Sequence, residues 1–89
     1  MEANLNIYVF TTRFVLKELS PIVYIMHESD GDWQFLGKED GLKEEDAMII
    51  SLAEMLKHDP TLITILDLPK GKEATRHDLG KEWIIKTIK

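Results

Sequence analysis

Alternating apolar and polar positions dominate the first 36 residues and predict β-strands. The run Ile7–Thr12 is rich in β-branched and aromatic side chains, which favours a strand. Ile22–Glu28 and Trp33–Leu36 have the same character, and they flank the dipeptide Asp30-Gly31. An Asp-Gly pair between two such runs is typical of a tight hairpin. We therefore predict that these two runs form a β-hairpin.

The position of the turn predicts which side chains share a face of this hairpin. With Asp30 and Gly31 as the two central turn residues, His27 lies opposite Gln34 and Met26 lies opposite Phe35. One face then carries Tyr24, Met26, Trp33 and Phe35, and the other carries Val23, Ile25, Leu36, His27 and Gln34. Because both faces are largely apolar, we expect the hairpin to be central in a sheet, with at least one face covered by a helix.

The middle of the chain contains a helix start. Ser51 followed by Glu54 forms a capping box, in which each side chain satisfies a backbone N–H of the first helical turn. We therefore predict a strand over Met48–Ile50 and a helix that begins at Ser51. The pattern leaves one alternative, a single helix over Glu44–Lys57. Residues 13–19 also stay ambiguous between a short helix and extended chain.

Further signals complete the predicted fold. Asp59-Pro60 is a second helix start, and Leu68-Pro69-Lys70-Gly71 ends that segment. Glu73–Arg76 and Trp83–Ile88 have the composition of two more strands. The sequence thus predicts one small α+β domain over residues 1–89, with a mostly antiparallel sheet, a central Asp-Gly hairpin and two short helices packed on one face.

Composition narrows the class of protein. The chain has 89 residues, 44% hydrophobic and 30% charged, which suits a globular domain with one core. It has no cysteine, which excludes disulfides and thiolate chemistry. No apolar run approaches the roughly 20 residues that span a bilayer. We expect a soluble, cytoplasmic protein that does not interact with membranes, with no cofactor and no bound metal.

Charge is unevenly distributed along the chain. Residues 28–46 contain eight acidic and two basic side chains, a net charge of −6, whereas the whole chain carries −5. Residues 70–89 carry +3. An acidic segment of this size repels a phosphate backbone, so we expect no nucleic acid partner. A basic protein is the better expectation, with Asp30, Asp32, Trp33, Glu44, Glu45 and Asp46 as candidate partner-binding residues.

A polar cluster at the hairpin tip is the other candidate site. His27, Asp32 and Gln34 converge there in the predicted register, and a histidine beside a carboxylate is the minimal unit of a general base or a metal site. The simpler interpretation is that His27 and Gln34 hydrogen-bond across the strands. No second histidine lies at ligand spacing, and a calcium loop over residues 28–39 would place Trp33 where glycine is required. The sequence shows no nucleophile elbow and no phosphate-binding glycine pattern.

Two aromatic residues and one basic pair have alternative interpretations. Trp33 and Trp83 are expected in the core, and either becomes an interface anchor if it is exposed. Arg76 and His77 are expected as exposed strand residues, with an anion or partner contact as the functional alternative.

Short motifs along most of the chain resemble one family. These motifs are Ser20-Pro21-Ile22, Asp30-Gly31-Asp32-Trp33-Gln34-Phe35, Ser51-Leu52, Asp59-Pro60, Asp67-Leu68-Pro69-x-Gly71, Ala74-x-Arg76 and Trp83. In this order they resemble small uncharacterised bacterial proteins grouped with the immunity-protein-like domains of polymorphic toxin systems. The resemblance implies a compact α+β domain that binds and blocks a toxin, with no catalytic residues to transfer. Lys72 departs from the pattern, since an aromatic residue often follows the Leu-Pro-x-Gly stretch in that family.

Three functional hypotheses follow. The first is a non-enzymatic protein-binding module, as in an immunity protein, whose acidic segment meets a basic partner. The second is a small metal-dependent or hydrolytic enzyme that uses His27 and Asp32. The third is an accessory domain that serves oligomerisation; the sequence leaves the oligomeric state open.

Overall fold

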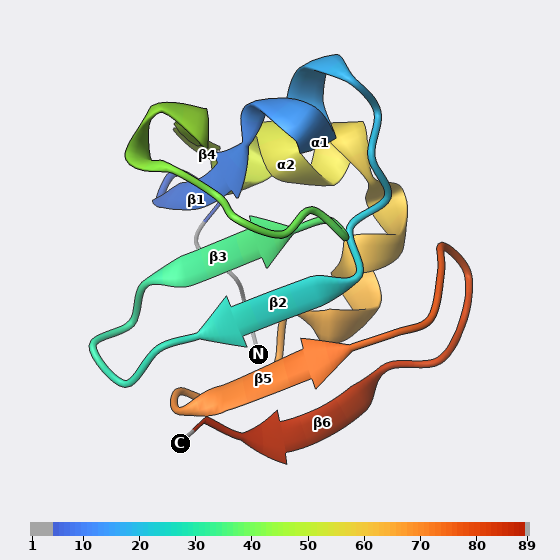
Figure 1. Cartoon of the computed structure of the whole chain (residues 1–89). Helices are drawn as coiled ribbons and strands as arrows, with labels where there is room; N and C mark the ends of the chain where they lie inside the picture. The colour runs from blue at the N-terminus through green and yellow to red at the C-terminus, as the bar shows by residue number, and fades with distance from the viewer. Residues whose placement is uncertain (1–4, 89) are drawn as a thin grey trace.

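A computed structural model describes residues 5–88, and these residues form a six-stranded sheet with short helices (Figure 1). The elements in chain order are β1 (Tyr8–Thr12), α1 (Arg13–Lys17), β2 (Tyr24–His27), β3 (Trp33–Leu36), the 3₁₀ helix η1 (Glu44–Asp46), β4 (Ala47–Ser51), α2 (Leu52–His58), the 3₁₀ helix η2 (Pro60–Ile65), β5 (Lys72–Thr75) and β6 (Ile84–Thr87). The predicted α+β class is therefore confirmed. None of the described helices is long and apolar enough to cross a membrane.

The sheet is mixed rather than purely antiparallel. Its strand order is β4-β1-β3-β2-β5-β6, and β1 runs parallel to β3, with Phe10 beside Gln34. The other four neighbouring pairs are antiparallel. The parallel pair arises because the chain passes through α1 and β2 before β3 returns beside β1.

The predicted register of β2 and β3 is wrong by one residue. His27 lies opposite Trp33 and Met26 opposite Gln34. The chain reverses over Ser29–Gly31: the N–H of Gly31 donates to the carbonyl of Glu28 (2.9 Å), and Gly31 adopts φ 100°, in the left-handed region that favours glycine. A three-residue loop of this kind uses the same Asp-Gly pair as a two-residue turn. A shift of one residue exchanges the faces of one strand relative to the other.

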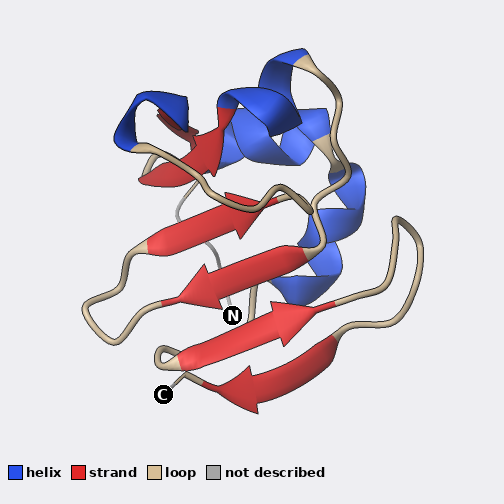
Figure 2. Cartoon of the chain, in the orientation of Figure 1, coloured by secondary structure: helices blue, strands red, loops and turns tan. Residues whose placement is uncertain are grey.

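Helices cover one face of the sheet, and the core lies between the two layers (Figure 2). The observed register places Ile25, Trp33 and Phe35 together on this covered face, which explains why this register is the favoured one. The buried side chains of the helical elements pack against them: Val15 from α1, Leu52 and Met55 from α2, and Leu62 and Ile65 from η2.

The segment around Ser51 folds as predicted. β4 ends at Ser51, and α2 begins at Leu52, with the N–H of Glu54 donating to the Ser51 Oγ (3.1 Å). The alternative of one helix over residues 44–57 is therefore wrong. Residues 13–17, which the sequence left ambiguous, form α1, whose N-cap is Thr12.

Arg76 is buried, contrary to the expectation of an exposed strand residue. Its Nε donates to the carbonyl of Ile22 (2.8 Å), its Nη1 to Thr61 Oγ1 (3.1 Å) and its Nη2 to Asp59 Oδ2 (3.0 Å). The guanidinium carbon lies 4.2 Å from the centre of the half-buried Trp83 ring. Arg76 thus joins β5, η2 and the segment before β2.

Candidate functional site

The face of the sheet opposite the helices carries exposed apolar side chains. We call it the open face. The pairs Ile49–Phe10, Phe10–Gln34 and Gln34–Met26 place one row of side chains across four neighbouring strands. Tyr8 is 73% exposed, Phe10 36% and Ile49 59%. Large apolar side chains that lie together on a surface often mark a site of interaction.

A cleft of about 320 Å³ lies on this face between the sheet and the segment that leads to η1. Phe10, Leu36 and Leu42 give it apolar walls, and Glu28 and Asp32 add carboxylates at the end toward the hairpin tip. Lys43 lines the cleft as well, so a ligand there would contact apolar surface, two carboxylates and one basic residue.

The hairpin tip brings three carboxylates together. Oxygen atoms of Glu28, Asp30 and Asp32 lie within 4.8 Å of one another, which is close enough to share one cation. Glu28 accepts a hydrogen bond from Gln34 Nε2 (3.1 Å), and Asp30 accepts one from the N–H of Asp32 (3.0 Å). Because Asp30 and Asp32 are exposed, we interpret the group as a negatively charged surface rather than as a closed metal site.

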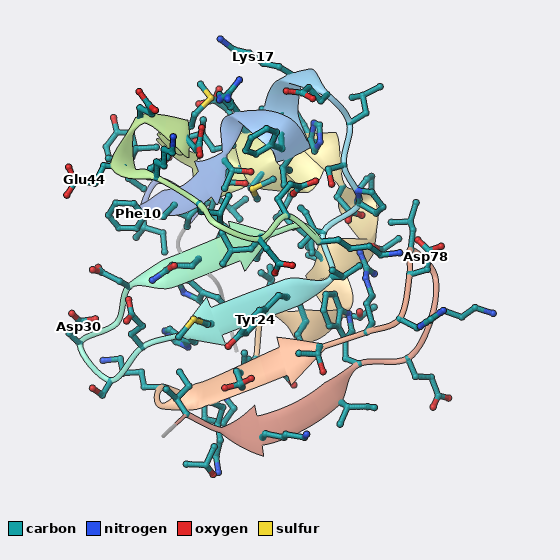
Figure 3. The ribbon with its side chains drawn as sticks, in the orientation of Figure 1. Phe10, Lys17, Tyr24, Asp30, Glu44 and Asp78 are labelled. Carbon is teal, nitrogen blue, oxygen red and sulfur yellow. The ribbon has the colours of Figure 1, made fainter. Side chains whose placement is uncertain are left out.

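The second part of the acidic segment separates into exposed and buried residues. Glu44 and Glu45 are exposed on η1, and in Figure 3 the labelled Glu44, Phe10 and Asp30 lie toward one side of the molecule. Asp46 is buried, and its Oδ1 accepts a hydrogen bond from Arg13 Nε (2.8 Å). Asp46 is therefore placed to hold η1 against α1, whereas Glu44 and Glu45 are accessible to a partner.

Hydrogen bonds keep Asp46 ionised. The backbone N–H of Lys43 donates to its Oδ2 (3.0 Å), and this bond, followed by the Arg13 hydrogen bond, holds the pKa of the Asp46 carboxyl below its ordinary value. Both interactions favour the charged form. The carboxylate thus connects the start of η1 to the start of α1.

The predicted cluster of His27, Asp32 and Gln34 does not form. The observed register places His27 on the covered face, where its ring stacks on Trp33 with 3.8 Å between the ring centroids. Its Nδ1–H donates to the carbonyl of Leu68 (2.7 Å). Gln34 and Asp32 line the cleft on the open face instead. This correction follows directly from the one-residue change of register.

Trp33 is only 6% exposed and stacks between His27 and Phe35. The sequence interpretation of Trp33 as a core residue is confirmed, so its candidate role as an interface anchor is not supported. Phe10, Tyr8, Ile49 and Leu42 replace it as accessible apolar residues. Alternation in Ile7–Thr12 could have indicated Tyr8 and Phe10, because both lie one position from the buried Val9.

A second cleft, of about 460 Å³, lies on a different part of the surface. It is lined by the exposed Leu19 and Leu79 and also by Lys57, His58 and Pro60. It contains none of the residues that the sequence singled out for a partner.

Comparisons with family models, with curated proteins and with solved structures find no match for this chain. The geometry and charge of the open face therefore carry the functional inference.

Proposed function

We propose that this chain is a non-enzymatic protein-binding module that binds a basic protein segment through its open face. One observation carries the proposal: the exposed Phe10 on the open face lies between accessible carboxylates on η1 and at the hairpin tip, as the labelled Glu44 and Asp30 show in Figure 3. Glu28 and Asp32 line the cleft beside Phe10, and Glu44 and Glu45 lie on η1, which leads directly into β4.

The chemistry of this face selects the partner. Lysine and arginine side chains lay their aliphatic stems on apolar surface while the charged group reaches a carboxylate. Complementary charge across an interface accelerates the association of the two proteins and disfavours partners whose surface carries the same charge. A segment that alternates apolar and basic residues therefore suits the open face.

The sequence resemblance to immunity-protein-like domains suggests one class of partner. A toxin with a basic surface would be blocked when the open face covers that surface. The enzymatic alternative has no geometric support, because His27 lies on the covered face and Asp32 lines the cleft on the open face. No specific observation favours the oligomerisation hypothesis.

The proposal is tested by affinity capture from a lysate of the native cell, followed by calorimetry with the purified partner. The test variant is E44K/E45K, and D67K is the control for charge reversal elsewhere on the surface, because Asp67 is also exposed but lies outside the open face. We expect a basic partner that binds the wild type and D67K equally and loses at least about tenfold in affinity for E44K/E45K. Equal binding by all three proteins would refute the proposed role of the acidic surface.

A further inference from the structure

Among the residues that the structure describes, β4 is an edge strand of the sheet, and its sequence lacks the usual protection against pairing. Its sequence, Ala-Met-Ile-Ile-Ser, contains no charged residue and no proline, and Ile49 at its centre is 59% exposed. Proteins normally protect an edge strand with lysine, proline, a bulge or a covering element, because unpaired backbone groups recruit other strands. β4 therefore has the features of an edge strand that can pair with a further strand.

The hydrogen-bond pattern identifies the free backbone groups. The N–H of Leu52 donates to the carbonyl of Ile7 (2.9 Å), just beyond the paired residues of β1 and β4. Hydrogen-bonded and non-hydrogen-bonded pairs alternate in antiparallel strands. Ile50 and Met48 therefore direct their backbone groups toward β1, whereas the N–H and C=O of Ile49 point away from the sheet. The Ile49 side chain lies opposite Phe10 on the open face.

Charges on both sides of β4 decide what can pair with it. Glu44 and Glu45 precede the strand, Glu54 follows it, and all three are exposed. If two copies paired antiparallel through Ile49, the start of β4 in one copy, next to Glu44 and Glu45, would lie beside the end of β4 in the other, next to Glu54. Like charges that are brought close together are unfavourable. The edge thus repels a second copy and attracts a strand with positive charge at its ends.

We infer that β4 is a site of strand addition for an extended basic segment of the partner. This inference rests on the proposed function, and it specifies how the partner binds. The incoming strand hydrogen-bonds to the backbone of Ile49, and its apolar side chains continue the row formed by Ile49 and Phe10. Its lysine or arginine residues meet the carboxylates at both ends of β4.

The probe for this inference is the capped peptide acetyl-Lys-Val-Lys-Val-Lys-Val-Lys-amide, with the Glu-Val analogue as the charge control. Calorimetry measures affinity, and amide hydrogen exchange measures protection of Ile49. We expect the basic peptide to bind and to slow exchange of the Ile49 N–H. We expect E44Q/E45Q/E54Q to bind about tenfold more weakly and E82Q, changed at an exposed glutamate outside the surface, to bind as the wild type does.

A backbone variant tests the strand geometry itself. I49P removes the outward N–H without removing a hydrogen bond to β1, and we expect it to lose at least about tenfold in affinity for the peptide. If I49P does not fold, protection of the Ile49 amide in the wild type still decides the question. An unprotected Ile49 amide in the complex would overturn strand addition.

The outcomes separate this inference from the proposed function. Binding that responds to E44Q/E45Q/E54Q but leaves the Ile49 amide unprotected would refute strand addition and retain the acidic open face as the binding surface. Absence of binding by the basic peptide would overturn the inference while leaving the partner capture above as the test of function. Sedimentation provides a further check: wild-type dimerisation through β4 would contradict the argument from charge.

Discussion

Arg76 offers the sharpest test of the packing described here. Its side chain is 1% exposed and donates hydrogen bonds to Ile22, Thr61 and Asp59. R76A would leave the Asp59 carboxylate, itself largely buried, without its cation. It would also remove the donor to the Ile22 carbonyl.

The expected loss of stability is large for a single substitution. Removing one partner of a buried ion pair costs about 3–5 kcal/mol, because the remaining charge is left without compensation. A domain of this size loses roughly 4–8 °C in Tm for each kcal/mol. R76A should therefore lower the Tm by roughly 12–40 °C. R76K should lie between R76A and the wild type, because an ammonium group lacks the planar fork that serves three acceptors.

Urea denaturation of the wild type, R76A, D59A and R76A/D59A measures the effect as a double-mutant cycle. We expect each single variant to be strongly destabilised and the double variant to lose much less than the two single losses combined. A loss below about 1 kcal/mol in R76A, within the range of an exposed pair, would refute the description of Arg76 as a buried connection.

Three further predictions concern single side chains. Leu19 is 75% exposed and adopts a φ of 58°, in the left-handed region. L19G should raise the free energy of unfolding by about 0.5–1 kcal/mol, because the left-handed strain of roughly 1–2 kcal/mol exceeds the entropic cost of glycine. A urea midpoint lower than that of the wild type would contradict this prediction. The folded-state pKa of Asp46 is depressed, so its contribution to stability is present above the ordinary pKa of an aspartate and is lost as the pH falls through the folded pKa. The urea midpoints of the wild type and D46N should therefore converge in acid. A difference between the two midpoints that stays constant with pH would contradict the role assigned to Asp46. Burial, followed by Glu73, raises the pKa of the Tyr24 phenol. In Y8F, where Tyr24 is the remaining tyrosine, the absorbance at 295 nm should therefore titrate above the ordinary tyrosine pKa of about 10, and the free energy of unfolding should fall as the pH rises through that value. A titration midpoint at or below about 10 would disprove this prediction.

Local signals in the sequence predicted the elements whose causes are local. The Ser51–Glu54 capping box placed the end of β4 and the start of α2, and Asp59-Pro60 placed the start of η2. These predictions succeed because a cap is satisfied within a few residues of the chain.

Features that depend on distant contacts were not predicted. Asp30-Gly31 permits two turn lengths, and only packing of Trp33 against the helix layer selects between them. The burial of Arg76 depends on Asp59, 17 residues earlier in the chain. For the site, the sequence indicated an acidic surface. The observed hairpin register places His27 and Trp33 on the covered face, away from that surface. Asp46 is buried against Arg13, so its carboxylate is not part of the accessible surface either.

The most direct test of the central claim is a titration of the ¹⁵N-labelled protein with the Lys-Val peptide, followed by its amide chemical shifts. Perturbed amides are expected in residues 8–12, 28–36 and 43–51, on the open face and at the β4 edge. Perturbations centred on the second cleft, around Leu19, Pro60 and Leu79, would contradict that claim, and so would a spectrum that the peptide leaves unchanged.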